Sequence, residues 1–253
     1  MRKKFIQIAL LLSSVFTSFN ANASDDIVVC GVPQVYSAVM SIKDFSPVKY
    51  DTYFGTQEDI EERVLSNSGT CTLILTDEEK LPVSLLRANK TSVDTVKQFI
   101  KAPLILWTKN KRLLLDDVRP IVKKKLKSIA LPKPELTSVG YSASEVSKMK
   151  NFPTEYLKKN NKIYRPNSEF QAYVLARSGK VQTAFVTKPL IMRNGRPTGS
   201  YWFIPHDYYS PIYYYIISTE NSKRAKELFD YLSTNSDALQ YFYRSGFEDL
   251  AKR

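Results

Sequence analysis

The sequence has 253 residues, of which 43% are hydrophobic and 25% are charged, as in ordinary globular proteins. These values exclude a disordered chain, a collagen-like repeat and a small disulfide-rich scaffold, and the length suffices for one large domain or two modest ones. The 37 basic and 25 acidic residues give a formal net charge of +12. This charge favours an anionic partner, but does not distinguish among nucleic acid, lipid and a small oxyanion.

The N-terminus has the three parts of an export signal. Residues 2–4 are basic, residues 5–19 are mostly apolar, and Ala21-Asn22-Ala23 has small residues at the positions that signal peptidase reads. The apolar part is too short for a membrane span, which needs about 20 apolar residues. We expect a signal peptide over residues 1–23, cleaved after Ala23, with a buried N-terminal helix as the alternative. The mature protein is then periplasmic, and no nucleic-acid partner is expected.

The next strand signal, residues 27–30, contains one of the two cysteines of the chain. Cys30 and Cys71 both lie in runs of β-type residues. Two cysteines usually pair in an oxidising compartment, so we predict a disulfide, with two buried free thiols as the alternative. A zinc site built from both cysteines and the single histidine, His206, would lack a fourth ligand, and no metal site is predicted.

Short apolar strands then alternate with amphipathic helices along the mature chain. This alternation predicts an α/β protein whose mostly parallel sheets are flanked by helices. The expected strands are 27–30, 48–53, 72–75, 103–107, 129–131, 183–186, 201–204 and 212–217. The expected helices follow Pro33, Thr56, about Ser142 (with Glu145 as its capping partner), Ser168 (with Gln171) and about Ser222.

Composition changes beyond the strand that ends near residue 107, which indicates two lobes. We predict that lobe 1 comprises residues 24–106 and 214–253, and that lobe 2, residues 107–213, is inserted into it. An inserted lobe requires two crossings, which we place near Leu104–Trp107 and Tyr213–Ile216.

The sequence contains no recognisable catalytic or nucleotide-binding motif. It has no G-x-S-x-G, H-E-x-x-H, Walker loop or G-x-G-x-x-G sequence. Instead, predicted helices begin after strands near Gly31, Thr56, 138–142 and Ser168. Their free N–H groups can bind an oxyanion at the carboxyl edge of a sheet, although each start is also explained by helix initiation alone.

Several segments resemble a known family in order and spacing. They are residues 56–77, 169–173 (EFQAY), 178–186 (SGKVQTAFV), 204–214 and 243–247 (YRSGF). In them the chain resembles the periplasmic molybdate-binding proteins of ABC transporters, which have the type II periplasmic binding fold. The resemblance implies two lobes with a two-strand hinge, and a monomer that needs no cofactor. It also implies a tetrahedral oxyanion held by hydroxyl and N–H groups for an inner-membrane ABC permease.

Carried over residue by residue, the resemblance places the ligand at both lobes. The implied ligand-binding residues are Val32, Thr56, Gln57, Ser138, Val139, Glu169 and Thr187. Two positions depart from the family pattern. Pro33 stands where the family has a serine and offers neither a hydroxyl nor an N–H group, and Glu169 brings a carboxylate towards a dianion.

Three functions are therefore considered. The first is a molybdate- or tungstate-binding subunit of an ABC importer. The second is a binding module of the same fold for another anion or an organic solute, serving a sensor or another non-transport partner. The third, an exported enzyme, has no nucleophile, metal set or acid–base pair in the sequence to support it.

Overall fold

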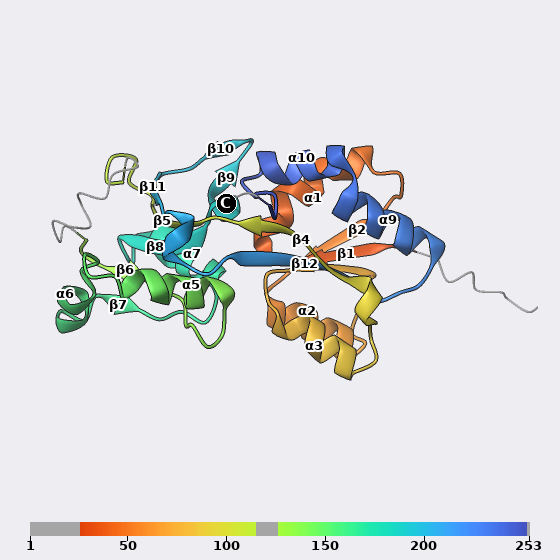
Figure 1. Cartoon of the computed structure of the whole chain (residues 1–253), viewed down its shortest axis with the longest axis horizontal. Helices are drawn as coiled ribbons and strands as arrows, with labels where there is room; N and C mark the ends of the chain where they lie inside the picture. The colour runs from red at the N-terminus through yellow and green to blue at the C-terminus, as the bar shows by residue number, and fades with distance from the viewer. Residues whose placement is uncertain (1–25, 115–125, 252–253) are drawn as a thin grey trace, which may run out of the picture.

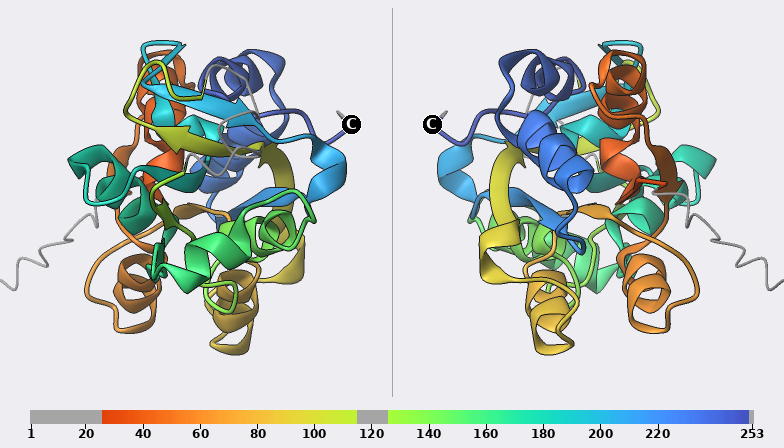
Figure 2. Two further views of the ribbon diagram at one scale, coloured as in Figure 1. Left: turned by 90° about the vertical axis from the view of Figure 1, so that its left-hand side faces the viewer. Right: turned by 90° about the vertical axis from the view of Figure 1, so that its right-hand side faces the viewer.

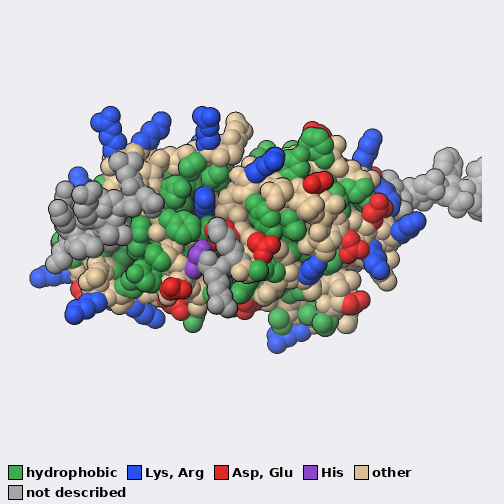
Figure 3. Space-filling model, turned by 45° about the horizontal axis from the view of Figure 1, so that its top comes forward, with side chains coloured by type: hydrophobic (Ala, Val, Ile, Leu, Met, Phe, Trp, Pro, Cys, Tyr) green, Lys and Arg blue, Asp and Glu red, His purple; other side chains and the backbone are tan. Residues whose placement is uncertain are grey.

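The computed structural model describes residues 26–114 and 126–251, so the expected signal peptide, 1–23, lies outside the described residues. The chain forms two lobes, each with a five-stranded sheet flanked by helices (Figure 1). Among the described residues, no helix is long and apolar enough to cross a bilayer. On the face shown in Figure 3, Lys and Arg side chains are scattered, most of them near the outline and a few in the middle.

The sheet of lobe 1 has the strand order β2-β1-β3-β12-β4. Its central strand β1 is parallel to β2 and β3, whereas β12 is antiparallel to both β3 and β4. Helices α1, α9 and α10 lie on one side of this sheet, and α2 and α3 on the other (Figure 2). The strands are β1 (Val28–Gly31), β2 (Asp51–Phe54), β3 (Leu73–Thr76), β4 (Val96–Ala102) and β12 (Ile212–Ser218). The helices are α1 (Tyr36–Ile42), α2 (Gln57–Leu65), α3 (Lys80–Arg87), α9 (Lys223–Thr234) and α10 (Ser236–Arg244).

The sheet of lobe 2 has the order β11-β5-β8-β6-β7. Alternate residues of its central strands pack on opposite faces, as the two-residue period of a strand requires. Phe185 of β8 packs in the same core as Val139 of α5, whereas Ala184 and Val186 pack in the core of Ala172 of α7. The strands are β5 (Leu104–Thr108), β6 (Ile129–Ala130), β7 (Ile163–Tyr164), β8 (Thr183–Thr187) and β11 (Ser200–Phe203). The helices are α5 (Ser138–Ser147), α6 (Thr154–Lys159), α7 (Glu169–Ser178) and α8 (Lys188–Ile191), and a short hairpin joins β9 (Met192–Arg193) to β10 (Arg196–Pro197).

Both sheets are mixed, which corrects the expectation of mostly parallel sheets. In lobe 2, β6 is parallel to β7 and β8, but β5 is antiparallel to β8 and β11. The strands next to the crossings, β4, β5, β11 and β12, supply every antiparallel pair of these two sheets. The antiparallel half of each sheet therefore arises where the chain passes between lobes.

The two crossings between the lobes lie side by side. Strand β4 ends at Ala102 and β5 begins at Leu104, so Pro103 alone separates the two sheets on the way out. The return runs over residues 204–211, between β11 and β12. The backbone N–H of Leu104 donates to the hydroxyl of Tyr209, with a distance of 3.0 Å, which joins the outgoing and returning segments. The chain thus passes from one sheet to the other a few residues before the expected lobe boundaries at 106/107 and 213/214.

Helices begin after the expected capping residues Thr56, Ser168 and Ser222, but not after Ser142. Thr56 caps α2, with its hydroxyl accepting from the N–H of Asp59, and Ser168 caps α7 by accepting from Gln171. The expected start of a helix near Ser142 is wrong. The helix α5 begins at Ser138 because Thr137 caps the N–H of Gly140 at 2.9 Å. Glu145 instead accepts hydrogen bonds from the N–H and hydroxyl of Ser210.

The predicted disulfide between Cys30 and Cys71 is confirmed. Their Cα atoms are 5.5 Å apart, and the bond joins β1 to the segment that enters β3. Both cysteines are buried, and β1 and β3 are hydrogen-bonded neighbours in the sheet. The bond therefore closes the β-α-β-α-β start of the chain into one covalent loop.

Candidate functional site

A pocket lies between the lobes, where turns from both of them meet. Lobe 1 contributes the turn after β1, the first turn of α2 and the segment after β3. Lobe 2 contributes the segment before α5 and the first turn of α7. The cavity is small, about 40 Å³, and it lies at the carboxyl ends of parallel strands, where open α/β sheets bind their ligands. Its lining residues are Val32, Pro33, Gln34, Thr56, Gln57, Glu58, Asp77, Glu78, Leu136, Thr137, Asn167, Ser168, Glu169 and Phe170.

Four of the seven implied ligand residues line this pocket: Val32, Thr56, Gln57 and Glu169. The other three lie around it. Thr187 is fully buried at the end of β8 and bonds to Glu169, whereas Ser138 lines a neighbouring pocket of about 340 Å³. Val139 is fully buried within the first turn of α5.

Some of the expected lobe 1 donors are already used within lobe 1. The N–H of Val32 donates to the carbonyl of Leu75 at 3.1 Å, and the N–H of Thr56 donates to the Asp59 carboxylate at 2.8 Å. The Thr56 hydroxyl accepts from the N–H of Asp59, which leaves its own proton available to a ligand. Thr56 can therefore still donate through its hydroxyl, whereas the Gln57 side chain also bonds to Glu78.

The Glu169 carboxylate is held by donors from both lobes. Its Oε1 accepts from the N–H of Thr187 at 2.6 Å and from the Thr187 hydroxyl at 2.7 Å. Its Oε2 accepts from the side-chain amide of Gln34, in lobe 1, at 2.5 Å. Glu169 is only 3% exposed, so this carboxylate is a buried bridge across the cleft.

Burial, together with the charge of Asp77, raises the pKa of Glu169 to about 7, although the hydrogen bonds from Gln34 and Thr187 oppose that rise. Burial also raises the pKa of Asp77 to about 6. The pKa of Glu78 is raised to about 7 by burial and by Asp77. Four lining residues, Glu58 and these three, carry carboxyl groups, and the lining residues of the described chain include no Lys, Arg or His. The pocket is therefore acidic, and protons bind to it near neutral pH.

Sequence reasoning missed Gln34 and Glu78. Gln34 follows Pro33 in the 3-10 turn Pro33–Val35 and supplies the donor that Pro33 cannot. Within the described chain, the Oε1 atom of Gln34 and the hydroxyl of Tyr214 are buried without a hydrogen-bond partner. A polar residue placed directly after the β1 turn was the one signal that could have pointed to Gln34.

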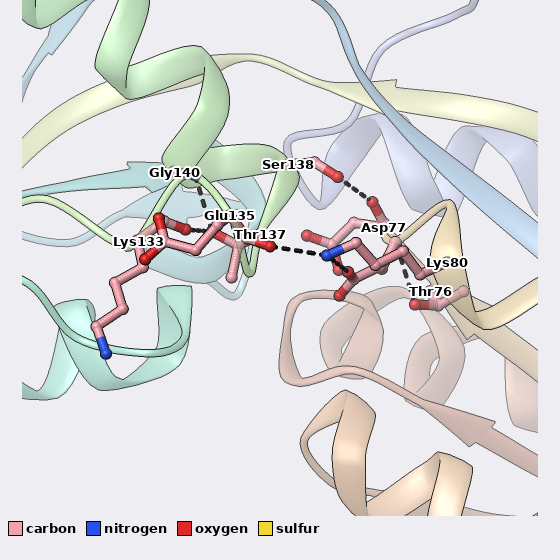
Figure 4. A network of polar contacts seen from close by, with 9 residues as sticks. Thr76, Asp77, Lys80, Lys133, Glu135, Thr137, Ser138 and Gly140 are labelled. Atoms are coloured by element: carbon pink, nitrogen blue, oxygen red, sulfur yellow. Dashed lines mark hydrogen bonds and ion pairs between the residues drawn. The ribbon is translucent and has the colours of Figure 1, made fainter. Parts of the chain in front are cut away.

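Two further contacts join the lobes beside the pocket (Figure 4). The Ser138 hydroxyl donates to the carbonyl of Asp77 at 2.7 Å, and Lys80 Nζ donates to the carbonyl of Glu135 at 2.7 Å. Together with the contact between Gln34 and Glu169, these bonds hold the two lobes in a closed arrangement.

Comparison with known proteins identifies relatives of this architecture. The family model described as bacterial extracellular solute-binding protein matches residues 38–248. The molybdate-binding protein ModA of Rhodobacter capsulatus is 27% identical over 147 residues, a match that spans 57% of this chain and 56% of that protein. The chain is thus aligned with little more than half the length of this curated relative.

Solved structures with the same fold are more distant in sequence. The periplasmic molybdate-binding protein of Azotobacter vinelandii has a TM-score of 0.74 and 17% identity, covering 88% of this chain and 98% of that one. PEB3 with bound L-phospholactate has a TM-score of 0.70 and 16% identity, over 88% and 100% of the two chains. The sulfate-binding protein SubI of Mycobacterium tuberculosis has a TM-score of 0.65 and 15% identity, over 89% and 87%. At these identities the likeness shows the two-lobe fold.

Proposed function

This chain belongs to the family of bacterial extracellular solute-binding proteins, and from this premise we propose that it captures a small oxyanion between its lobes for an ABC importer. The homologues and the fold are those of binding proteins rather than enzymes. Three of the structural relatives are described with molybdate, L-phospholactate or sulfate, which are all oxyanions. That shared chemistry supports the same ligand class here.

The observation that carries the proposal is the set of donors that converges on the cleft. Gln34 from lobe 1 and the N–H and hydroxyl groups of Thr187 from lobe 2 together surround a pair of carboxylate oxygens. A carboxylate is itself an oxyanion, so these donors have the chemistry that a free oxyanion needs. Hydrogen bonds to an ionised acceptor are about twice as strong as neutral ones. Thr56 and Gln57 add donors at the opposite wall of the pocket.

Family membership supports a site of action outside the cytoplasm. We propose export through residues 1–23, cleavage after Ala23 and a periplasmic monomer that docks on an inner-membrane permease and needs no cofactor. N-terminal sequencing of the secreted or periplasmic protein tests the cleavage, which should leave Ser24 as the first residue. An intact N-terminus on the exported protein would contradict it.

The acidic lining favours a second candidate, a small cationic solute such as an amine. Glu58, Asp77, Glu78 and Glu169 all line the pocket, and the described lining has no basic residue to balance them. Such a ligand would donate hydrogen bonds to these carboxylates and to the spare Gln34 Oε1. This arrangement suits a solute with several N–H groups.

Calorimetric titration of the mature protein decides between the two candidates. The ligands are molybdate, tungstate, sulfate, phosphate and small organic anions on one side, and small amines on the other. Binding of a tetrahedral oxyanion that is weakened by Thr187→Val supports the proposed function. Binding of an amine alone would assign the cleft to cationic solutes, and the oxyanion function would then be wrong.

A further inference from the structure

The Glu169 carboxylate already occupies donors that a captured oxyanion would need. Both Thr187 donors and the Gln34 amide bond to it at 2.5–2.7 Å, and it is buried between the lobes. A second anion cannot share the two Thr187 donors, because each of these protons serves one strong acceptor at a time, whereas the Gln34 amide has a second N–H proton. An external oxyanion therefore binds at the Thr187 donors only if the Glu169 side chain leaves them.

We propose, on the basis of the proposed function, that Glu169 is a built-in ligand of the cleft, and that an external oxyanion binds by displacing its carboxylate with uptake of a proton. Glu169 thus sets both the affinity and the selectivity of the site. It holds the lobes together without a solute, and it discriminates against anions that compete poorly with a carboxylate.

The surroundings of Glu169 contain acceptors but no compensating cation. Asp77, after β3, and Glu169 interact through their charges, and both also act on Tyr214 of β12. Gln34 and Thr187 are the neutral donors from the β1 turn and from β8. Glu78 and Glu58 complete the charged groups of the pocket, whose described lining has no Lys, Arg or His. An arriving anion therefore increases the repulsion on every one of these carboxylates.

Two buried polar atoms could form new hydrogen bonds after an oxyanion has displaced the Glu169 carboxylate. Gln34 Oε1 and the Tyr214 hydroxyl have no hydrogen-bond partner among the described residues. A buried polar group left unpaired is unfavourable, because it has lost its hydrogen bonds to water. A protonated Glu169 could donate to Gln34 Oε1 after rotation of the amide, and the Tyr214 hydroxyl could donate to a bound anion. Both unpaired atoms thus gain partners in the form that the proposal requires.

The direction of the pH effect follows from these charges. In the ligand-free protein the pKa of Glu169 is about 7, and a bound anion beside it raises that pKa further. Above about pH 7 binding must then bring a proton with it, so affinity falls by up to about tenfold per pH unit. Below that pH the carboxyl is already protonated, and the affinity becomes nearly constant.

The test measures Kd for molybdate and tungstate by calorimetry at about pH 6.5 and about pH 8.5. Wild type should bind at least about tenfold more weakly at the higher pH, and should take up about one proton there, measured from two buffers of different ionisation enthalpy. Glu169→Ala, which frees the donors, should bind about tenfold more tightly than wild type at the higher pH. Glu169→Gln should retain its shape but lose most of the pH dependence.

Glu78→Gln is the matched control, because it removes a carboxylate with a similar pKa from the same pocket without freeing the Thr187 donors. Its gain in affinity should be clearly smaller than that of Glu169→Ala. Equal gains, or equal Kd values for wild type and Glu169→Ala at both pH values, would overturn the role of Glu169 and leave the proposed function standing. If neither wild type nor Glu169→Ala binds molybdate or tungstate at either pH, nor the sulfate, phosphate and small organic anions titrated above, the oxyanion function itself is wrong, and this inference is wrong with it.

Discussion

Glu169 lies at the first position of α7, where a negative side chain ordinarily stabilises a helix by interacting with its dipole. On an exposed helix this residue would be unremarkable. Here the side chain is directed into the cleft, where Thr187 and Gln34 bind it and Asp77 acts on it. From the sequence, Glu169 is explained as a residue that stabilises the start of a helix. In the folded protein, its carboxylate lies where a ligand would bind.

The buried carboxyl groups make stability depend on pH. Asp77, Glu78 and Glu169 have folded-state pKa values of about 6, 7 and 7, all above their ordinary values. The folded protein therefore binds protons more tightly than the unfolded chain, so this contribution is fully present below about pH 4 and is lost as pH rises to about 7. We expect the free energy of unfolding, measured in urea, to be lower at pH 8 than at pH 5.5. The decrease should be smaller in Glu169→Gln, and an equal decrease would contradict the assignment.

Thr56 combines two roles that substitution can separate. Its hydroxyl caps α2 and its side chain lines the pocket. Thr56→Val should lose about 1 kcal/mol of stability as a cap and weaken oxyanion binding about tenfold. Thr56→Ser keeps the hydroxyl and should preserve both. Urea unfolding and calorimetry measure the two effects, and a Thr56→Val variant with unchanged Kd would remove Thr56 from the ligand set.

Helices α2, α5 and α7 all present their first turns to the space between the lobes, and each is capped by a hydroxyl residue of the segment before it. Those caps are Thr56, Thr137 and Ser168. In α5 the start is fixed also by Gly140, since a Cβ atom there would lie 2.4 Å from the carbonyl oxygen of Lys133. The close contact holds α5 against the turn before it and presents Ser138 to Asp77 of the other lobe.

The disulfide should stabilise the first three strands of lobe 1. Cys30 and Cys71 are 41 residues apart, and closing a loop of that length stabilises by about 4 kcal/mol in the chain-entropy model. The Cys30→Ala, Cys71→Ala double variant should lose a comparable free energy of unfolding in urea. Wild type in a reductant should show a similar loss, which controls for the effect of the substitutions. Equal stability of oxidised and reduced wild type would contradict this expectation.

At the scale of the whole molecule, three polar contacts hold the lobes closed around an acidic pocket. They are Gln34 with Glu169, Ser138 with the carbonyl of Asp77, and Lys80 with the carbonyl of Glu135. The hinge consists of two crossings that are bonded to each other through Leu104 and Tyr209. The lobes can therefore separate by changes at Pro103 and residues 204–211 without breaking either sheet.

Small-angle scattering tests whether Glu169 contributes to this closure. Ligand-free Glu169→Ala should have a larger radius of gyration than wild type, because the carboxylate that bridges the lobes is absent. Saturating molybdate should reduce the radius of the variant more than that of wild type. Glu78→Gln serves as the control, because the contacts of Glu78 with Thr76, Lys80 and Gln57 all lie within lobe 1. Identical radii for wild type and Glu169→Ala, with and without ligand, would show that Glu169 does not hold the lobes.

Local signals in the sequence were sufficient to predict most strands, the helix caps at Thr56 and Ser168, and the disulfide. These features depend on residues a few positions apart or, for the disulfide, on two cysteines at the neighbouring strands β1 and β3. The start of α5 was misplaced, because Ser142 with Glu145 has the same pattern as a true cap. The competing signal at Thr137 depends on how closely Gly140 approaches Lys133.

The site itself depended on contacts that no local pattern contains. Gln34 and Glu169 are 135 residues apart, and Thr187 is 18 residues beyond Glu169. The family resemblance could place the Glu169 carboxylate near the ligand turns. It could not show that the two lobes would supply this carboxylate with three donors, since the direction of a buried side chain is set by packing and by the partners that its polar atoms find. The tertiary structure therefore decided that the side chain of Glu169, the first residue of α7, lies in the cleft.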